Sequence, residues 1–294
     1  MSAEPHRVAR MTDRSLLLVH AHPDDETIGT GATMAKYVAD GANVTLVTCT
    51  LGEEGEVLVP ELAGIAADKA DQLGGWRIHE LQQACKALGV RDHRFLGGAG
   101  GYRDSGMMDT PANQNPRCFW QADLEVATAQ LVEIIREVRP QVVVTYDDFG
   151  GYGHPDHIQA HRVTVRAVEQ TSDIVAKLYY SAVPRSFMQL SIDAMKEGGH
   201  DFFGGIESAD DVPFARDDDE ITAQVDARDY LDLKMEAMRA HASQIETDGP
   251  FFALSNHIGH KAFGLEHYVL MAGKKGPGDS PGGRDWESDL FAGL

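Results

Sequence analysis

The stretch His22-Pro23-Asp24-Asp25-Glu26 places an imidazole beside three consecutive carboxylates. His22 and Asp25 are three residues apart, so one turn of helix or a tight bend lets both side chains face a single ion. A mixed imidazole and carboxylate set suits Zn²⁺ or a similar divalent metal. Asp24 lies between these two residues and would point elsewhere, where it can act as a base on a water molecule.

The same residues also fit a helix N-terminus that binds no metal. Asp24 or Asp25 could cap the helix, and Glu26 would favour the helix macrodipole. The two interpretations are compatible, since one residue can cap while another binds. His20, in the preceding apolar run, is predicted to lie in the core or to support the site rather than to bind the ion.

A second polar stretch follows another apolar run and ends in His154-Pro155-Asp156-His157. Pro155 suits the first turn of a helix, and Asp156 favours the start of that helix. His157 and His161 would share one helix face. His157 lies nearer the helix start, so we predict it as the third metal ligand and expect His161 to lie in the core or to support the site. Three protein ligands with one open position are typical of catalytic rather than structural zinc.

Tyr152 and His154 belong to a glycine-rich loop near the expected open position. A tyrosine on a flexible loop can donate a hydrogen bond to a developing oxyanion, and a protonated His154 can stabilise the same charge or protonate a leaving amine. The alternatives are a surface aromatic ring and a solvent-facing histidine. With three ligands and an unused carboxylate, these donors predict metal-dependent hydrolysis, whereas the spacing does not identify the substrate.

Both polar stretches follow expected strands, Ser15–Ala21 and Gln141–Tyr146. Strands and helices alternate over about the first 170 residues, which predicts parallel βαβ units. We therefore predict an α/β protein with a Rossmann-like, open, mostly parallel sheet and helices on both faces. In such sheets ligands bind at the carboxyl ends of the strands. The other elements expected in this part are strands at Asn43–Thr50 and Phe95–Leu96, and helices at Thr27–Asp40, His79–Leu88 and Ala122–Val138.

The C-terminal part is expected to be a mixed elaboration of this core. We expect one domain over residues 14–294, with the α/β core at 14–175 and the elaboration at 176–294, after a disordered tail at 1–13. The elements expected in the elaboration are strands at Lys177–Ala182, Ile221–Val225 and Glu266–Met271, a helix at Ala227–Ile245, and a Gly- and Asp-rich surface insertion at Ser191–Glu220.

Composition excludes several classes of partner. The 294 residues include 26 Lys and Arg against 46 Asp and Glu, a formal net charge of −20, which disfavours nucleic acids and anionic membranes. The apolar run Leu16–Val19 is too short for a signal peptide or a membrane span. Three scattered cysteines, Cys49, Cys85 and Cys118, form no disulfide framework, so we expect buried thiols and a reducing cytoplasm. The sequence indicates no oligomeric state.

The chain resembles the LmbE-like, or PIG-L, family of zinc-dependent N-deacetylases. The resemblance rests on AHPDDE at Ala21–Glu26 and GGYGHPDH at Gly150–His157, and it extends from Leu16 over nearly the whole chain, least clearly between about Pro184 and Asp226. It is strongest to the branch that acts on N-acetylglucosaminyl-inositol in mycothiol biosynthesis. Further matching stretches are Thr48–Val57, Ala70–Leu81, Leu96–Met107, Arg139–Asp147, Glu266–Leu270 and Trp286–Leu294.

The resemblance implies a role for each of nine residues. It assigns the metal ligands to His22, Asp25 and His157, in agreement with the spacing. It assigns the general base to Asp24 and the oxyanion-stabilising groups to Tyr152 and His154. It also implies that Arg77, Asp104 and Glu56 bind the sugar and inositol, for which the residues alone give no independent reason.

The implied reaction is hydrolysis of the N-acetyl group of an N-acetylglucosaminyl-inositol, a small-molecule substrate, to acetate and an amine. Within the same family, the alternative is another LmbE-like sugar N-deacetylase. The implied cofactor is one Zn²⁺ per subunit, although a His and Asp set also accepts Fe²⁺ or Co²⁺.

Two other interpretations remain open at this stage. A related amidase cleaves mycothiol S-conjugates, but it looks to carry a lysine just after its HPDDE stretch, where this chain has Ile28-Gly29-Thr30-Gly31. A non-enzymatic polyol- or nucleotide-binding module is the second, and the missing glycine fingerprint after the first strand argues against a dinucleotide.

Overall fold

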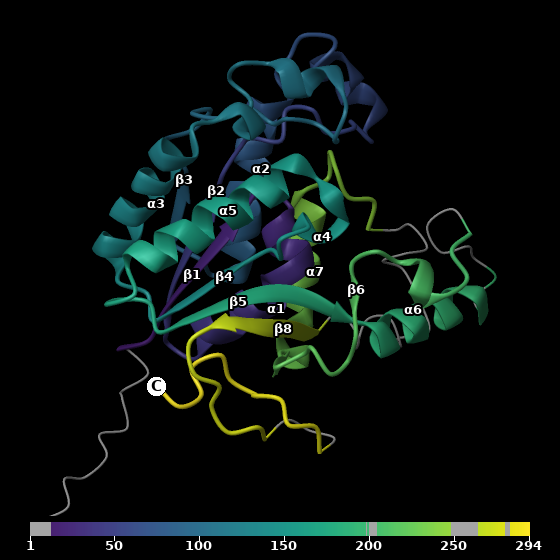
Figure 1. The fold of residues 1–294 in the computed structure, drawn as a ribbon. Helices are drawn as coiled ribbons and strands as arrows, with labels where there is room; N and C mark the ends of the chain where they lie inside the picture. The colour runs from purple at the N-terminus through teal and green to yellow at the C-terminus, as the bar shows by residue number, and fades with distance from the viewer. Residues whose placement is uncertain (1–12, 198, 200–204, 248–263, 280–282) are drawn as a thin grey trace, which may run out of the picture.

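The predicted open sheet is confirmed in a computed structural model of the chain, which describes residues 13–197, 199, 205–247, 264–279 and 283–294 (Figure 1). The strand order is β3-β2-β1-β4-β5-β8-β7, and a short strand, β6, pairs with β5 off this path. The strands are β1 Ser15–His20, β2 Asn43–Thr48, β3 Asp92–Phe95, β4 Val142–Thr145, β5 Lys177–Pro184, β6 Ala215–Arg216, β7 Ala223–Asp226 and β8 Leu265–Ala272.

The strands from β3 to β5 run parallel, whereas β8 is antiparallel to both of its neighbours. All six residues of β1 are buried, as expected for a strand covered on both faces. β1 and β4 pair directly, with Leu16 opposite Val142 and Leu18 opposite Val144. The chain segments that follow these two strands therefore leave the sheet side by side at one edge.

Helices cover both faces of the sheet (Figure 1). The helices are α1 Asp25–Ala39, α2 Leu73–Leu88, α3 Leu124–Val138, α4 Gly150–Gly153, α5 Pro155–Gln170, α6 Arg185–Glu197 and α7 Leu231–Ala240. One buried cluster joins α1, α2 and α7 to the sheet, and a second joins α3 and α5 to the opposite face. Short 3₁₀ turns are Pro60–Ile65, Pro111–Gln114, Phe119–Gln121, Ala209–Asp211 and Arg228–Tyr230.

Three helices differ from the sequence-based prediction, and the strand expected at Phe95–Leu96 instead spans Asp92–Phe95 as β3. α2 begins at Leu73 rather than His79, and it contains Gly74, a residue type that weakens helices. Close packing explains the glycine, since a Cβ there would come within 2.9 Å of the Cβ of Leu51. The expected insertion at Ser191–Glu220 begins inside α6, whose Met188, Ile192 and Met195 pack into a small core of their own.

The third difference concerns the helix expected at Ala227–Ile245. The observed helix, α7, is shorter and spans Leu231–Ala240. The expected disordered tail lies outside the described residues, apart from Asp13.

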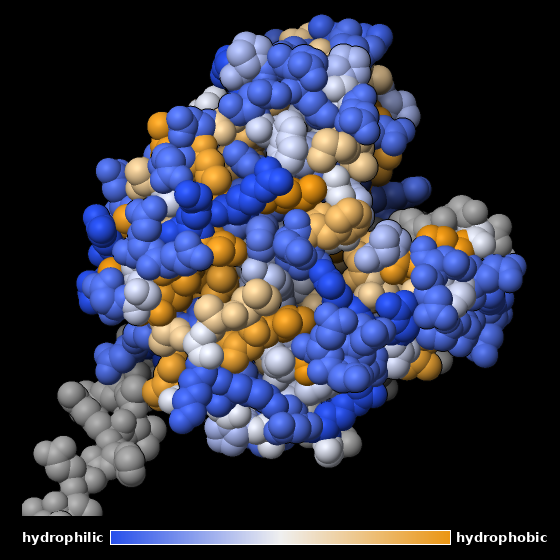
Figure 2. Space-filling view, in the orientation of Figure 1, coloured by the Kyte–Doolittle hydropathy of each residue, from blue (hydrophilic) through white to orange (hydrophobic). Residues whose placement is uncertain are grey.

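The visible surface is mostly polar (Figure 2), as expected for a chain in which 24% of the residues are charged. The face seen in Figure 2 is mostly hydrophilic, with small dispersed apolar patches. None of the helices in the described part of the chain is long and apolar enough to cross a bilayer. Cys49, Cys85 and Cys118 are all buried and free, as expected.

Candidate active site

The three side chains predicted as metal ligands converge at the edge where β1 and β4 end. His22 Nδ1 lies 3.2 Å from Asp25 Oδ2 and 3.3 Å from His157 Nε2. His157 Nε2 lies 3.3 Å from Asp25 Oδ2, which closes the triangle. His22 and His157 are buried, and the Asp25 side chain is nearly so. Residues 135 positions apart in the chain therefore present donor atoms to one point.

This triangle fits a tetrahedral cation. Donor atoms about 2.0–2.1 Å from a tetrahedral Zn²⁺ are separated from one another by about 3.4 Å. The three observed separations of 3.2–3.3 Å agree with that value. Burial acts to raise the pKa of Asp25, but His157 and His22 outweigh it and hold this pKa well below its usual value. The carboxylate is therefore ionised, as a ligand must be.

The other ring nitrogen of His22 faces two carboxylates. His22 Nε2 lies 3.1 Å from Asp156 Oδ2 and 3.5 Å from Asp104 Oδ1. Ser105 in turn donates its backbone N–H to Asp156. A carboxylate on the second nitrogen fixes the tautomer and orientation of a metal-binding histidine and leaves Nδ1 free to bind. From its position in the sequence, Asp156 is expected only at the helix start.

Tyr146 supports the other two ligands. Its hydroxyl donates to Asp25 Oδ2 at 2.8 Å and accepts the backbone N–H of Ala21 at 2.8 Å. Its ring stacks on His157 with a centroid separation of 4.1 Å. His20 contacts Tyr146 and Thr30 and lies behind the ligands, as predicted. Tyr146 is the last residue of an expected strand, and no spacing rule singled it out.

Asp24 occupies a strained turn beside the ligands. Its φ of 109° lies in a region that non-glycine residues rarely adopt, and its side chain makes no capping hydrogen bond to α1. Instead, Arg77 Nη2 donates to Asp24 Oδ2 at 2.9 Å. Burial raises the pKa of Asp24 to about 6, although Arg77 opposes that rise. A carboxyl group of that pKa can exchange protons near neutral pH.

His154 and Tyr152 lie on the loop between β4 and α5. His154 Nδ1 accepts the backbone N–H of Asp156 at 3.2 Å, and the rings of His154 and His22 are 4.5 Å apart. Burial and the neighbouring His22 lower the pKa of His154 to about 3. The lowered pKa favours a neutral imidazole, whose donor is Nε2–H because Nδ1 accepts from Asp156. The role of His154 stays a prediction. Tyr152 is half exposed, with its ring centroid 5.0 Å from that of His157.

The residues that the resemblance assigned to the substrate differ in their positions. Arg77 is buried and also donates to the carbonyl oxygens of Gly52 and Pro23. Asp104 is buried against His22, and its carboxylate accepts the backbone N–H groups of Glu54 and Gly106. Within the described residues, no hydrogen bond or ion pair joins the exposed Glu56 carboxylate to this cluster. All three roles remain predictions.

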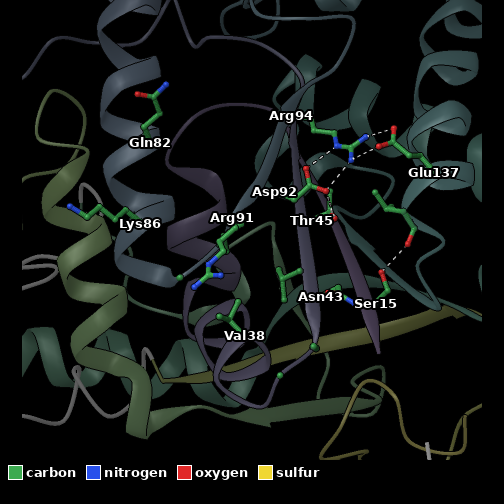
Figure 3. A pocket seen from close by; sticks show the side chains of 16 residues that line it. Ser15, Val38, Asn43, Thr45, Gln82, Lys86, Arg91, Asp92, Arg94 and Glu137 are labelled. Carbon is green, nitrogen blue, oxygen red and sulfur yellow. Dashed lines mark hydrogen bonds and ion pairs between the residues drawn. The ribbon is translucent and has the colours of Figure 1, made fainter. Parts of the chain in front are cut away.

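A separate hollow lies at the opposite edge of the sheet (Figure 3). It encloses about 1040 Å³ at the amino ends of the first three strands, beside Ser15, Asn43 and Asp92. Arg94 on its wall is held by Asp92 and Glu137. Ligands of parallel sheets bind at the carboxyl ends, so this hollow is not the candidate active site.

Comparison with known proteins agrees with the geometry. The sequence pattern of the PIG-L family, described as GlcNAc-PI de-N-acetylase, matches residues 17–168. A protein of Acidothermus cellulolyticus named 1D-myo-inositol 2-acetamido-2-deoxy-alpha-D-glucopyranoside deacetylase is 67% identical over 282 residues, which span 96% of this chain and 95% of that protein.

Solved structures support the fold. The N,N'-diacetylchitobiose deacetylase of Pyrococcus horikoshii has a TM-score of 0.54 at 22% identity, covering 89% of this chain and 85% of its own. The 4-carboxy-2-hydroxymuconate hydratase of Pseudomonas putida has a TM-score of 0.57 at 17% identity, covering 89% and 97%. Since a hydratase shares this fold, the fold alone does not define the reaction. The family pattern matches more than half of this chain, and the relative that is 67% identical spans nearly all of it. This chain therefore belongs to the PIG-L family of N-deacetylases.

Proposed function

We propose that this chain hydrolyses the N-acetyl group of 1D-myo-inositol 2-acetamido-2-deoxy-α-D-glucopyranoside, releasing acetate and the free amine for mycothiol biosynthesis. The observation that carries the proposal is the triangle of His22, Asp25 and His157. Asp24, the residue before Asp25, has its carboxylate held by Arg77. The identity of 67% to a deacetylase of that name supports the choice of substrate.

We assign the cation to Zn²⁺, held by His22, Asp25 and His157. When bound, the cation supplies Lewis acidity that polarises the amide carbonyl and makes water a better nucleophile. Asp156 and Asp104 keep the ring of His22 oriented toward it. Three carboxylates around His22 also favour a positive charge at this point.

Asp24 carries the proton through the reaction. Held by Arg77, its carboxylate removes a proton from the attacking water and then delivers that proton to the amide nitrogen as the C–N bond breaks. Tyr152 and the Nε2–H of His154 donate hydrogen bonds to the carbonyl oxygen as it gains negative charge. One water is consumed, and its oxygen leaves in acetate.

Substrate choice is tested with two amides. Purified, zinc-loaded protein is given N-acetylglucosaminyl-inositol and, separately, a bulky mycothiol S-conjugate, and released acetate and amine are measured. We expect a kcat/KM at least about tenfold higher for the first amide, and loss of activity with a chelator. Faster cleavage of the S-conjugate would reassign the chain as an amidase.

The role of Asp24 is tested by Asp24→Ala. We expect kcat to fall by about 10²- to 10⁴-fold while the zinc content is retained. His157→Ala is the matched comparison, because it should instead lower zinc affinity. Full turnover in Asp24→Ala would remove Asp24 from the mechanism.

The free, buried cysteines also support a proposed location in the cytoplasm, where thiols stay reduced.

A further inference from the structure

A four-residue segment of the C-terminal part contacts three parts of the candidate active site. α7 ends at Ala240, and the chain then continues as His241–Gln244, which we call the HASQ segment. It lies far beyond residues 17–168, which match the family pattern. Its side chains and backbone bond to the first turn of α1, to α2 and to the loop around Glu56.

The first contact reaches the backbone of Asp24. His241 Nε2 bonds to Glu26 Oε1 at 2.8 Å, and neither side chain is exposed to solvent. The other oxygen of the same carboxylate, Oε2, accepts the backbone N–H of Asp24 at 2.8 Å. A histidine 215 residues along the chain from Glu26 thus connects through one carboxylate to the strained peptide of the proposed base.

The second contact reaches the helix that carries Arg77. Ser243 donates its backbone N–H and its hydroxyl to the two carboxylate oxygens of Glu80, at 2.9 Å and 2.7 Å. Glu80 lies one turn of α2 after Arg77, whose guanidinium holds the Asp24 carboxylate. The HASQ segment therefore supports both the backbone and the side chain of Asp24.

The third contact is with the loop around Glu56. Ser243 accepts the backbone N–H of Leu58 at 3.0 Å, and Gln244 donates to the backbone carbonyl of Glu56 at 3.0 Å. Among the described residues, no hydrogen-bond partner is present for two buried atoms here, His241 Nδ1 and Arg77 Nε. Backbone strain clusters at functional sites, and a buried polar atom without a partner needs an explanation.

We propose that His241 is a positioning residue for hydrolysis, acting through Glu26 on the backbone of Asp24. The bond from Glu26 holds Asp24 in its positive-φ conformation, and His241 fixes the orientation of the Glu26 carboxylate. The C-terminal elaboration thereby completes an active site whose reacting groups all belong to the first part of the chain. This inference rests on the proposed role of Asp24.

The test compares three full-length variants under zinc-loaded conditions: His241→Ala, His241→Gln and the control His267→Ala. His267 is also a buried histidine of the C-terminal part, and it bonds to Gln224, away from the site. For His241→Ala we expect kcat to fall about 10- to 100-fold, with KM within about threefold of wild type and unchanged zinc content. His241→Gln should recover most of the loss, because its amide can donate to Glu26.

Several results would overturn the inference. They are a kcat of His241→Ala equal to that of the control, no recovery in His241→Gln, or a loss explained by missing zinc or raised KM. If His241→Ala does not fold, His241→Asn replaces it, since its shorter amide does not reach Glu26. Equal kcat values for the Asn and Gln variants would then contradict the proposal.

Asp24→Ala, measured in parallel, separates the two hypotheses. An inactive Asp24→Ala with an unaffected His241→Ala removes only the positioning role. A fully active Asp24→Ala removes the proposed mechanism itself.

Discussion

At the scale of single residues, His22 has different partners on its two ring nitrogens. Nδ1 faces Asp25 and His157, whereas Nε2 faces Asp156 and Asp104. The assignment of one nitrogen to the cation therefore makes the other a donor to Asp156. Asp156 is fully buried, and the backbone N–H of Ser105 also donates to its carboxylate.

Asp156→Ala should lower zinc affinity by about 10- to 100-fold, since His22 loses the group that orients its ring. Asp156→Asn should have a smaller effect, because its amide oxygen still accepts from Nε2. Zinc affinity is measured by competition with a chromogenic chelator, with the exposed Asp68→Ala as the control. An unchanged affinity in Asp156→Ala would contradict the assignment of Nε2.

At the scale of elements, the approach of α4 to α5 depends on a glycine. Gly150 has a φ of 67°, and a Cβ there would come within 2.7 Å of the Cβ of His157. Asp147, two residues after the end of β4, anchors the same turn by accepting the backbone N–H of Gly151 at 2.8 Å. The turn therefore fixes both the ligand His157 and the loop tyrosine.

Gly150→Ala should displace His157 and lower both zinc affinity and kcat/KM, the latter by about 10- to 100-fold. Gly29→Ala on α1 is the matched control, because a Cβ there meets nothing within 4 Å. The control should stabilise the helix by about 0.5–1 kcal/mol, measured by urea unfolding. Equal activity in the two variants would show that the turn tolerates a side chain.

Local spacing predicted only part of this arrangement. The apolar patterns predicted where β1 and β4 end. The short spacing within each polar stretch then predicted the ligands His22, Asp25 and His157. The contacts from Tyr146 to Asp25 and from His241 to Glu26 could not be predicted, because they span 121 and 215 residues and depend on how the elements pack. α6 was missed because its flanking Gly- and Asp-rich sequence indicated a loop.

At the scale of the whole molecule, the C-terminal part extends the sheet rather than forming a separate layer. β8 pairs with β5, and the final segment is attached by a fully buried ion pair between Lys177 and Glu287 at 2.6 Å. Tyr179 donates to the same carboxylate at 2.7 Å. We propose that residues 14–294 fold as one domain.

Lys177→Met should destabilise the protein by about 3–5 kcal/mol, because it leaves the buried Glu287 carboxylate without its cation. Lys36→Met is the control, since Lys36 pairs with Asp40 at the partly exposed end of α1, and it should cost less than about 1 kcal/mol. Both values come from urea unfolding followed by circular dichroism. Similar small losses in both variants would contradict the attachment by the buried pair.

The most direct test of the metal centre is a crystal structure of the zinc-loaded protein with anomalous diffraction recorded at the zinc edge. A second set of donors is close by, since atoms of His22, Asp104, His154 and Asp156 also lie within 4.8 Å of one another. We predict one anomalous peak, about 2.0–2.2 Å from His22 Nδ1, the Asp25 carboxylate and His157 Nε2. A peak bound instead to His22 Nε2 and the second set would contradict the ligand assignment and the mechanism built on it.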